Sequence, residues 1–144
     1  MKKIAICVDL NEQCFKTLKK LKNSELFKNA EIHLVHFFEI QVYTAEFTPF
    51  VFPTTDQYPD IEKSTIQSLA NLENDLGITA KKVCKFVHSS EESVHEYLKE
   101  QNINLVVVST QGKHGIEGFF HSSFTDYLVK YSPCDVFVVR PKSE

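Results

Sequence analysis

The sequence contains little glycine, and its few glycines are unevenly placed. Only four of the 144 residues are glycines, and three of them (Gly112, Gly115 and Gly118) fall within the stretch "STQGKHGIEGFFHSS". A short apolar segment, "NLVVV", precedes this stretch, and an amphipathic segment, "SFTDYLVKYSP", follows it. Between a strand and a helix, such a loop offers backbone N–H groups to an anionic ligand. An ordinary connecting loop can have the same composition, so both interpretations stay open at this point.

The standard phosphate-binding and nucleophile motifs are absent. The chain has no G-x-G-x-x-G pattern and no G-x-S-x-G elbow. A P-loop is also excluded, because Gly112-Lys113 is followed by His114 instead of a serine or threonine. On spacing alone, the loop is therefore a weak indicator of a phosphate site.

Long apolar runs and an excess of positive charge are lacking too. No apolar run approaches the roughly 18 residues of a membrane span, and "MKKIAICVDL" at the start has no long apolar region of a signal peptide. The net charge is −3, so the chain has no electrostatic footprint for nucleic acid. We expect a soluble, cytoplasmic protein with neither a membrane nor a nucleic acid as partner.

Cysteine and histidine are too scattered to indicate a metal site. The four cysteines show no C-x-x-C spacing, and we expect reduced thiols. His114 and His121 flank the loop, but no further histidine or cysteine stands at metal-ligand spacing, so we predict no metal. His33 and His36 are interpreted as structural. Ser122 and Ser123 have no base placed beside them by spacing, which favours helix capping over catalysis, and we predict no enzyme activity.

What is present is an alternation of two hydrophobic patterns. Short apolar runs predict five strands, and segments with apolar residues three and four positions apart predict the helices between them. The strands are expected at 3–8, 31–38, 81–87, 104–109 and 135–140, and the helices after Asn11, at 60–77, at 89–100 and along the stripe Phe120, Phe124, Leu128 and Tyr131. This order predicts one α/β domain over residues 1–144, with an open parallel sheet and helices on both faces.

The segment "QVYTAEFTPFVFPTTDQYP" (41–59) does not fit the alternation. It holds three of the five prolines and five aromatic residues. A loop of this length inside a compact domain is usually functional or mobile. We expect its aromatic side chains to cover a sheet face; a lid over a ligand and a surface for a partner are the alternatives.

In an open parallel sheet, ligands bind beyond the carboxyl ends of the strands, where the strand order reverses. Asp9 ends the first predicted strand and Ser109 ends the fourth. If these strands are neighbours, Asp9 and the glycine loop face one crevice. A carboxylate on one side and backbone N–H groups on the other suit a nucleotide.

In these features the chain resembles the universal stress protein family. The resemblance rests on "CVDL" at the end of the first strand, "LVHF" in the second, the glycine loop after the fourth and "SPCDVFVV" (132–139) near the end. It runs through the whole chain and is strongest from 104 to 141. It implies a Rossmann-like sheet of strand order 3-2-1-4-5, like that of adenine nucleotide alpha hydrolases, with two helices on each face. It also implies a homodimer that pairs through the last strand, 135–140.

The resemblance also implies an adenine-nucleotide site, with ATP or AMP as ligand. Asp9 matches the residue that contacts adenine, and Phe37 stands where the second strand offers backbone to the base. Nucleotide-binding members carry G-x-x-G, nine residues, then G-S or G-T. Here Ser109 and Ser122 replace two of the three glycines, and weakened or absent nucleotide binding is expected. The other candidates are Gln111 and Gly112 in the loop, and Ser123, Phe124 and Thr125 at the start of the following helix.

Two functions of different kinds follow from this resemblance. The first is a stress-response regulatory protein with a degenerate nucleotide crevice. The second is a nucleotide-free dimeric module that acts through partner surfaces. Nucleotide released from the denatured protein would favour the first.

Overall fold

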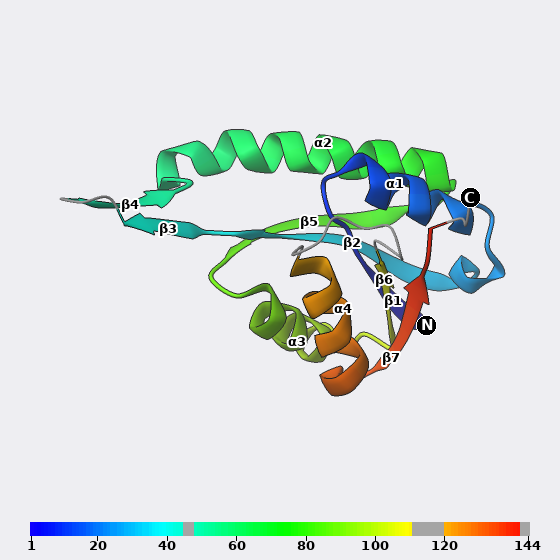
Figure 1. Cartoon of the computed structure of the whole chain (residues 1–144). Helices are drawn as coiled ribbons and strands as arrows, with labels where there is room; N and C mark the ends of the chain where they lie inside the picture. The colour runs from blue at the N-terminus through cyan, green and yellow to red at the C-terminus, as the bar shows by residue number, and fades with distance from the viewer. Residues whose placement is uncertain (45–47, 111–119, 142–144) are drawn as a thin grey trace.

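The chain forms a five-stranded parallel sheet with helices on both faces (Figure 1). The computed structural model describes residues 1–44, 48–110 and 120–141, without the side chains of residues 120–122. The strands of the main sheet are β1 (Lys2–Cys7), β2 (Ala30–Glu39), β5 (Ala80–Val87), β6 (Leu105–Ser109) and β7 (Asp135–Val139). Their order is β5-β2-β1-β6-β7. Counted within this sheet alone, that is 3-2-1-4-5, so the predicted order is confirmed.

The two central strands read as continuous apolar runs because both of their faces are covered. Ile4, Ala5 and Ile6 of β1 are buried, as are Val106 and Val107 of β6. The two strands pair in parallel, with Ile4 opposite Leu105. Side chains of successive residues point to opposite faces, so a strand with helices on both sides needs apolar residues at consecutive positions.

Two helices cover each face, as expected. α1 (Glu12–Leu18) and α2 (Tyr58–Leu76) lie on one face, and α3 (Ser90–Glu100) and α4 (Phe120–Tyr131) lie on the other (Figure 1). Each helix pair covers its own core cluster. Leu18 of α1 and Leu69 of α2 belong to the first cluster, and Leu98 of α3 and Leu128 of α4 belong to the second.

Local signals fix the helix ends. Asn11 caps α1, since its side chain accepts the N–H of Cys14 at 2.8 Å. Ser89 caps α3 by accepting the N–H of Glu92. α2 ends at Gly77, whose φ of 69° is left-handed, as the sequence predicted. The described residues also form three short 3-10 helices, η1 (Lys19–Leu21), η2 (Glu25–Phe27) and η3 (Thr55–Gln57).

The segment 41–59 was expected to cover a sheet face, and that expectation is wrong for the aromatic residues of its two strands. β3 (Gln41–Thr44) and β4 (Pro49–Phe52) form an antiparallel hairpin that continues β2 and projects from the main sheet (Figure 1). Every described residue of both strands is exposed. Phe47 lies outside the described residues. Among the described aromatic residues of the segment, Tyr58, at the start of α2, stacks on the sheet, with its ring centroid 4.0 Å from that of Phe86.

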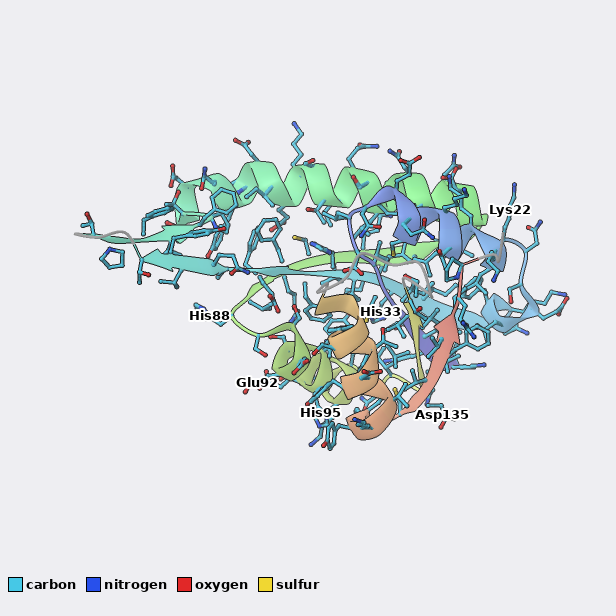
Figure 2. All side chains as sticks on the ribbon, in the orientation of Figure 1. Lys22, His33, His88, Glu92, His95 and Asp135 are labelled. Atoms are coloured by element: carbon cyan, nitrogen blue, oxygen red, sulfur yellow. The ribbon has the colours of Figure 1, made fainter. Side chains whose placement is uncertain are left out.

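One residue of the predicted helical stripe in α4 also differs. Tyr131 is 62% exposed, whereas Leu128 is fully buried. Tyr131 packs instead against Tyr127 on the helix surface. In Figure 2, His33 lies inside the molecule, while the charged residues Glu92 and Asp135 lie on its surface. In the described part of the chain, no helix combines the length and apolar character needed to cross a membrane.

Candidate functional site

A pocket lies at the carboxyl edge of the sheet, where β1 and β6 are neighbours. Side chains and backbone from three strands and two helices line it. Its described lining residues are Cys7, Asp9, Phe37, Ser90, Val108, Ser109, Phe124 and Thr125. Five of the nine residues predicted for the site (Asp9, Phe37, Ser109, Phe124 and Thr125) therefore lie together.

A cysteine sulfur links the two strand ends that form the floor of this pocket. Cys14, on the first turn of α1, accepts the backbone N–H of Asp9 at 3.3 Å and the hydroxyl of Ser109 at 3.2 Å. Cys14 is buried, and its desolvation raises its pKa to about 11. The thiol therefore stays protonated at neutral pH. It holds Asp9 and Ser109 in a fixed relation instead of acting as a nucleophile.

The Ser109 hydroxyl is thus already engaged as a donor. A serine hydroxyl has one proton to donate, and that proton points to the Cys14 sulfur. A phosphate oxygen can only accept hydrogen bonds. Ser109 would have to give up its contact with Cys14 in order to bind phosphate through its side chain.

β2 contributes Phe37 to the pocket, and the adjacent His36 ties β2 to the end of β1. Phe37 is buried, and its ring lies edge-on to Tyr97, with centroids 6.2 Å apart. On the adjacent residue, His36 Nδ1 donates to the carbonyl oxygen of Val8 at 2.7 Å. Burial lowers the pKa of His36, although the Val8 carbonyl and Asp9 oppose the shift. The neutral ring therefore ties β2 to the residue just before Asp9.

The helices supply the opposite wall. Thr125 of α4 is buried and Phe124 is half-buried. Ser123 is exposed, and its hydroxyl donates to Glu91 Oε1 at 3.1 Å. The second serine hydroxyl expected at phosphate is therefore also engaged, and its partner is an anion. Glu91 lies in the first turn of α3, beside Ser90, whose N–H donates to Glu39 Oε1.

Three predicted residues fall outside this description. Gln111 and Gly112 lie outside the described residues, as does His114. Ser122 belongs to the first turn of α4, but its side chain, like that of His121, is not described. The proposed phosphate contacts of the loop therefore stay predictions.

The pocket also contains a thiol that the sequence did not place there. Cys7 lines the pocket, but burial raises its pKa, and nearby Asp9 and Cys14 add to the shift. A protonated thiol is a poor nucleophile. All four cysteines are free. Among the described residues, no group of three or more His, Cys, Asp or Glu could hold a metal ion.

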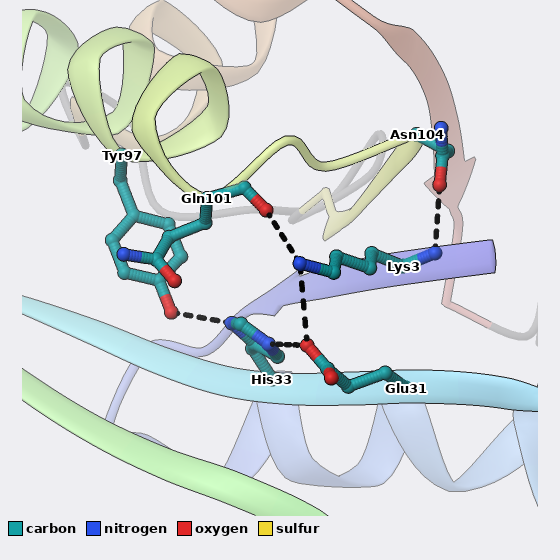
Figure 3. A network of polar contacts seen from close by, with 6 residues as sticks. All are labelled: Lys3, Glu31, His33, Tyr97, Gln101 and Asn104. Carbon is teal, nitrogen blue, oxygen red and sulfur yellow. Dashed lines mark hydrogen bonds and ion pairs between the residues drawn. The ribbon is translucent and has the colours of Figure 1, made fainter. Parts of the chain in front are cut away.

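A second polar cluster lies toward the amino ends of the strands (Figure 3). His33 is buried, and its ring contacts the Tyr97 hydroxyl at 2.6 Å and Glu31 Oε2 at 2.7 Å. Lys3 reaches Glu31 at 4.0 Å and the Gln101 carbonyl at 3.4 Å. Burial raises the pKa of Tyr97 to about 12, so the phenol keeps its proton.

This cluster is structural. It fastens α3 to β1 and β2, and through Tyr97 it orients the ring of Phe37. The buried hydrogen bonds of His33 and His36 agree with the prediction that both are structural. Sequence reasoning missed Ser90 in the pocket lining, and it missed Cys14 and Glu91 as hydrogen-bond partners of Ser109 and Ser123. Cys14 falls in an apolar helical stripe, which indicates only burial. Ser90 reaches the pocket, and Glu91 reaches Ser123, through tertiary packing.

Comparison with known proteins bears on the fold and on the family. Solved structures that match over nearly the whole chain include universal stress protein UspA from Lactobacillus plantarum, with 16% identity, TM-score 0.66 and coverage of 96% of this chain and 97% of that one. An Arabidopsis thaliana family protein with AMP bound is 14% identical, with TM-score 0.62 and coverage of 99% and 94%. The Archaeoglobus fulgidus protein in complex with dAMP is 8% identical, with TM-score 0.63 and coverage of 96% and 98%.

These identities establish a shared fold. No curated protein matches the sequence. The sequence profile of the Universal stress protein family, however, matches residues 1–140. The structure independently shows the parallel sheet, its strand order and the pocket beside Asp9. The chain therefore belongs to the universal stress protein family.

Proposed function

We propose that this protein is a stress-response regulator whose pocket receives an adenine nucleotide with low affinity. The observation that carries the proposal is the convergence of Asp9, Phe37, Ser109, Phe124 and Thr125 on one pocket at the strand switch point. Related proteins in complex with AMP and dAMP support the class of ligand. Asp9 would contact the base, and the start of α4 would face the phosphate.

Low affinity follows from three features of the phosphate side. Ser109 and Ser122 place a Cβ where nucleotide-binding relatives have glycine. The hydroxyls of Ser109 and Ser123 donate to Cys14 and Glu91, so neither is free to donate to phosphate. Glu91 also places a carboxylate near the start of α4, which disfavours a second anion there.

A test follows from the two serine-for-glycine replacements. Ser109→Gly combined with Ser122→Gly should tighten ATP binding by about 10² to 10⁴, if each recovered phosphate contact contributes roughly 1.5–3 kcal/mol. Calorimetry with ATP and with AMP would measure the change. The matched control is Ser109→Ala with Ser122→Ala, which removes both hydroxyls but keeps each Cβ and should not tighten binding. Sub-micromolar binding by the unchanged protein, or no gain in the glycine variant, would contradict the proposal.

The remaining parts of the proposal concern activity, location and assembly. We assign no catalytic role to the pocket, because burial keeps its Cys7 thiol protonated and the exposed Ser123 hydroxyl donates to the weakly basic carboxylate of Glu91. Steady ATP turnover by the purified protein that disappears in Asp9→Ala would overturn this. We place the protein in the cytoplasm and expect a homodimer through β7.

The second candidate is a nucleotide-free interaction module of the same family. The engaged serine hydroxyls and the carboxylate of Glu91 favour it. Nucleotide released when the purified protein is denatured would support the first candidate. No release, together with an unchanged melting temperature in millimolar ATP or AMP, would support the second.

A further inference from the structure

The β3–β4 hairpin is an apolar surface that nothing in the described chain covers. Five large apolar side chains on it are each between 42% and 60% exposed. These are Val42 and Tyr43 on β3 and Phe50, Val51 and Phe52 on β4. Monomeric proteins seldom leave so many neighbouring apolar side chains in water.

The hairpin has two distinct apolar faces. Tyr43 lies opposite Phe50, and their rings stack with centroids 5.1 Å apart and an angle of 21° between planes. Phe52 falls on the same face, because side chains two residues apart on a strand point the same way. Val42 and Val51 lie opposite each other on the other face.

The backbone of the hairpin is also incompletely paired. Among the described residues, β3 and β4 pair only with each other, so each strand keeps one open edge. An isolated two-stranded hairpin is marginal in water and needs a third strand or a packed face. The described hairpin strands carry no charged residue, whereas β5, at the edge of the main sheet, carries Lys81, Lys82 and Lys85. Lysines on an edge strand oppose pairing with another chain, and the hairpin lacks this protection.

We propose that the hairpin binds the hairpin of a second copy of this chain, so that two hairpins form one intermolecular sheet. A two-fold axis brings identical antiparallel edges together, which makes an open strand edge complementary to itself. Because the described residues of β3 and β4 are uncharged, pairing these strands places no like charges opposite each other within them.

The available area supports a second copy. Tyr43, Phe50 and Phe52 share one face and are each about half exposed. At roughly 150–250 Å² for a fully buried aromatic side chain, contact with a partner covers about 300 Å² on each hairpin. Two copies then bury about 600 Å², the size of a weak interface that depends on protein concentration.

Substitution of one hairpin aromatic tests the proposal. Phe50→Ser should weaken self-association at least about 100-fold, because both copies lose a buried ring. The matched control is Tyr131→Ser on α4, which removes a ring that is similarly exposed, at 62% against 57%, but lies outside the hairpin. Val42→Ser, on the other hairpin face, is a second variant. Circular dichroism would verify that each variant remains folded.

The experiment must distinguish association through β7 from association through the hairpin. Light scattering over a concentration series would give the mass of the unchanged protein, of Phe50→Ser, of Val138→Pro and of the double variant. We expect assemblies larger than a dimer for the unchanged protein, a dimer for each single variant and a monomer for the double variant. The proposal fails if Val138→Pro is a monomer across the series, or if Phe50→Ser has the mass of the unchanged protein. If β7 does not pair, Phe50→Ser alone should give a monomer, so the two proposals fail separately.

Discussion

At the scale of single residues, His36 is a neutral hydrogen-bond donor that joins two strand ends. Its ring donates to the Val8 carbonyl, and burial lowers its pKa below the ordinary value of 6.5. The unfolded chain therefore takes up a proton at His36 at a higher pH than the folded chain does. The stability that depends on the neutral ring is present above about pH 6.5 and is lost as the pH falls below it.

His36→Asn should make the free energy of unfolding less dependent on pH between about pH 7 and pH 5. Asparagine keeps an N–H donor for the Val8 carbonyl but does not titrate. Urea unfolding followed at a series of pH values would measure the effect. His88→Asn, at an exposed position, is the control and should leave the slope nearly unchanged. If the free energy of unfolding depends equally on pH in the unchanged protein and in His36→Asn, another group determines the loss of stability at low pH.

The site could be predicted only where a residue follows directly from strand order. Asp9 and Ser109 come together because β1 and β6 are neighbours, and the family resemblance supplied that order. Cys14 could not be predicted as their link, since an amphipathic stripe says which side is buried but not which atom is reached. The contact between Ser123 and Glu91 joins α4 to α3 across 32 residues, and no local pattern reports it.

At the scale of elements, the end of α2 depends on a backbone conformation. Gly77 has a φ of 69°, and its N–H donates to the Asn74 carbonyl at 3.1 Å. A Cβ added there would meet Asn23 Oδ1 at 3.7 Å, an ordinary contact. The cost of Gly77→Ala is therefore the cost of the left-handed conformation alone.

We expect Gly77→Ala to lower the free energy of unfolding by about 1–2 kcal/mol. Chemical denaturation would measure this loss. Gly77→Asn is the matched comparison, because asparagine tolerates the left-handed region, and it should cost less. A loss much larger than 2 kcal/mol for alanine would mean that the turn packs against more than the structure indicates.

The strands and helices of the main sheet were predictable because their hydrophobic periods are clear. The hairpin was not, because Pro49 and Pro53 within the apolar run argue against strands, and no glycine marks the turn. Pro49 is tolerated at the first position of β4, where a strand can begin without a donor. Pro53 follows the last residue of β4 and is buried.

At the scale of the whole molecule, the two edges of the main sheet differ. β5 carries three lysines, whereas β7 exposes Phe137 and Val138 and has one charged residue, Asp135. Val139 accepts the N–H of Thr110 on the β6 side. Because backbone groups of successive strand residues point in opposite directions, the N–H of Val138 faces outward, where a second β7 would bind.

Val138→Pro should therefore remove the β7 contact without breaking the pairing of β6 with β7. Light scattering should show the assembly mass falling to that of a dimer where the hairpins also pair, and to that of a monomer where they do not. Val138→Thr is the control, because threonine is β-branched and keeps the outward N–H, and its mass should not change. A fall in mass for both variants would point to side-chain packing, and a fall for neither would remove β7 from the assembly.

The hairpin follows directly on β2, the strand that contributes Phe37 to the pocket. β3 begins at Gln41, two residues after the end of β2, and Phe37 lies four residues before it. The Ile40 N–H donates to the Val87 carbonyl at 2.7 Å, which fixes this junction to β5. A partner that displaces the hairpin therefore also displaces the segment of β2 that presents Phe37. Thermodynamic linkage makes such an effect mutual. A ligand that shifts β2 must change the affinity between hairpins by the same factor, so nucleotide affinity should vary with protein concentration wherever the two events are coupled.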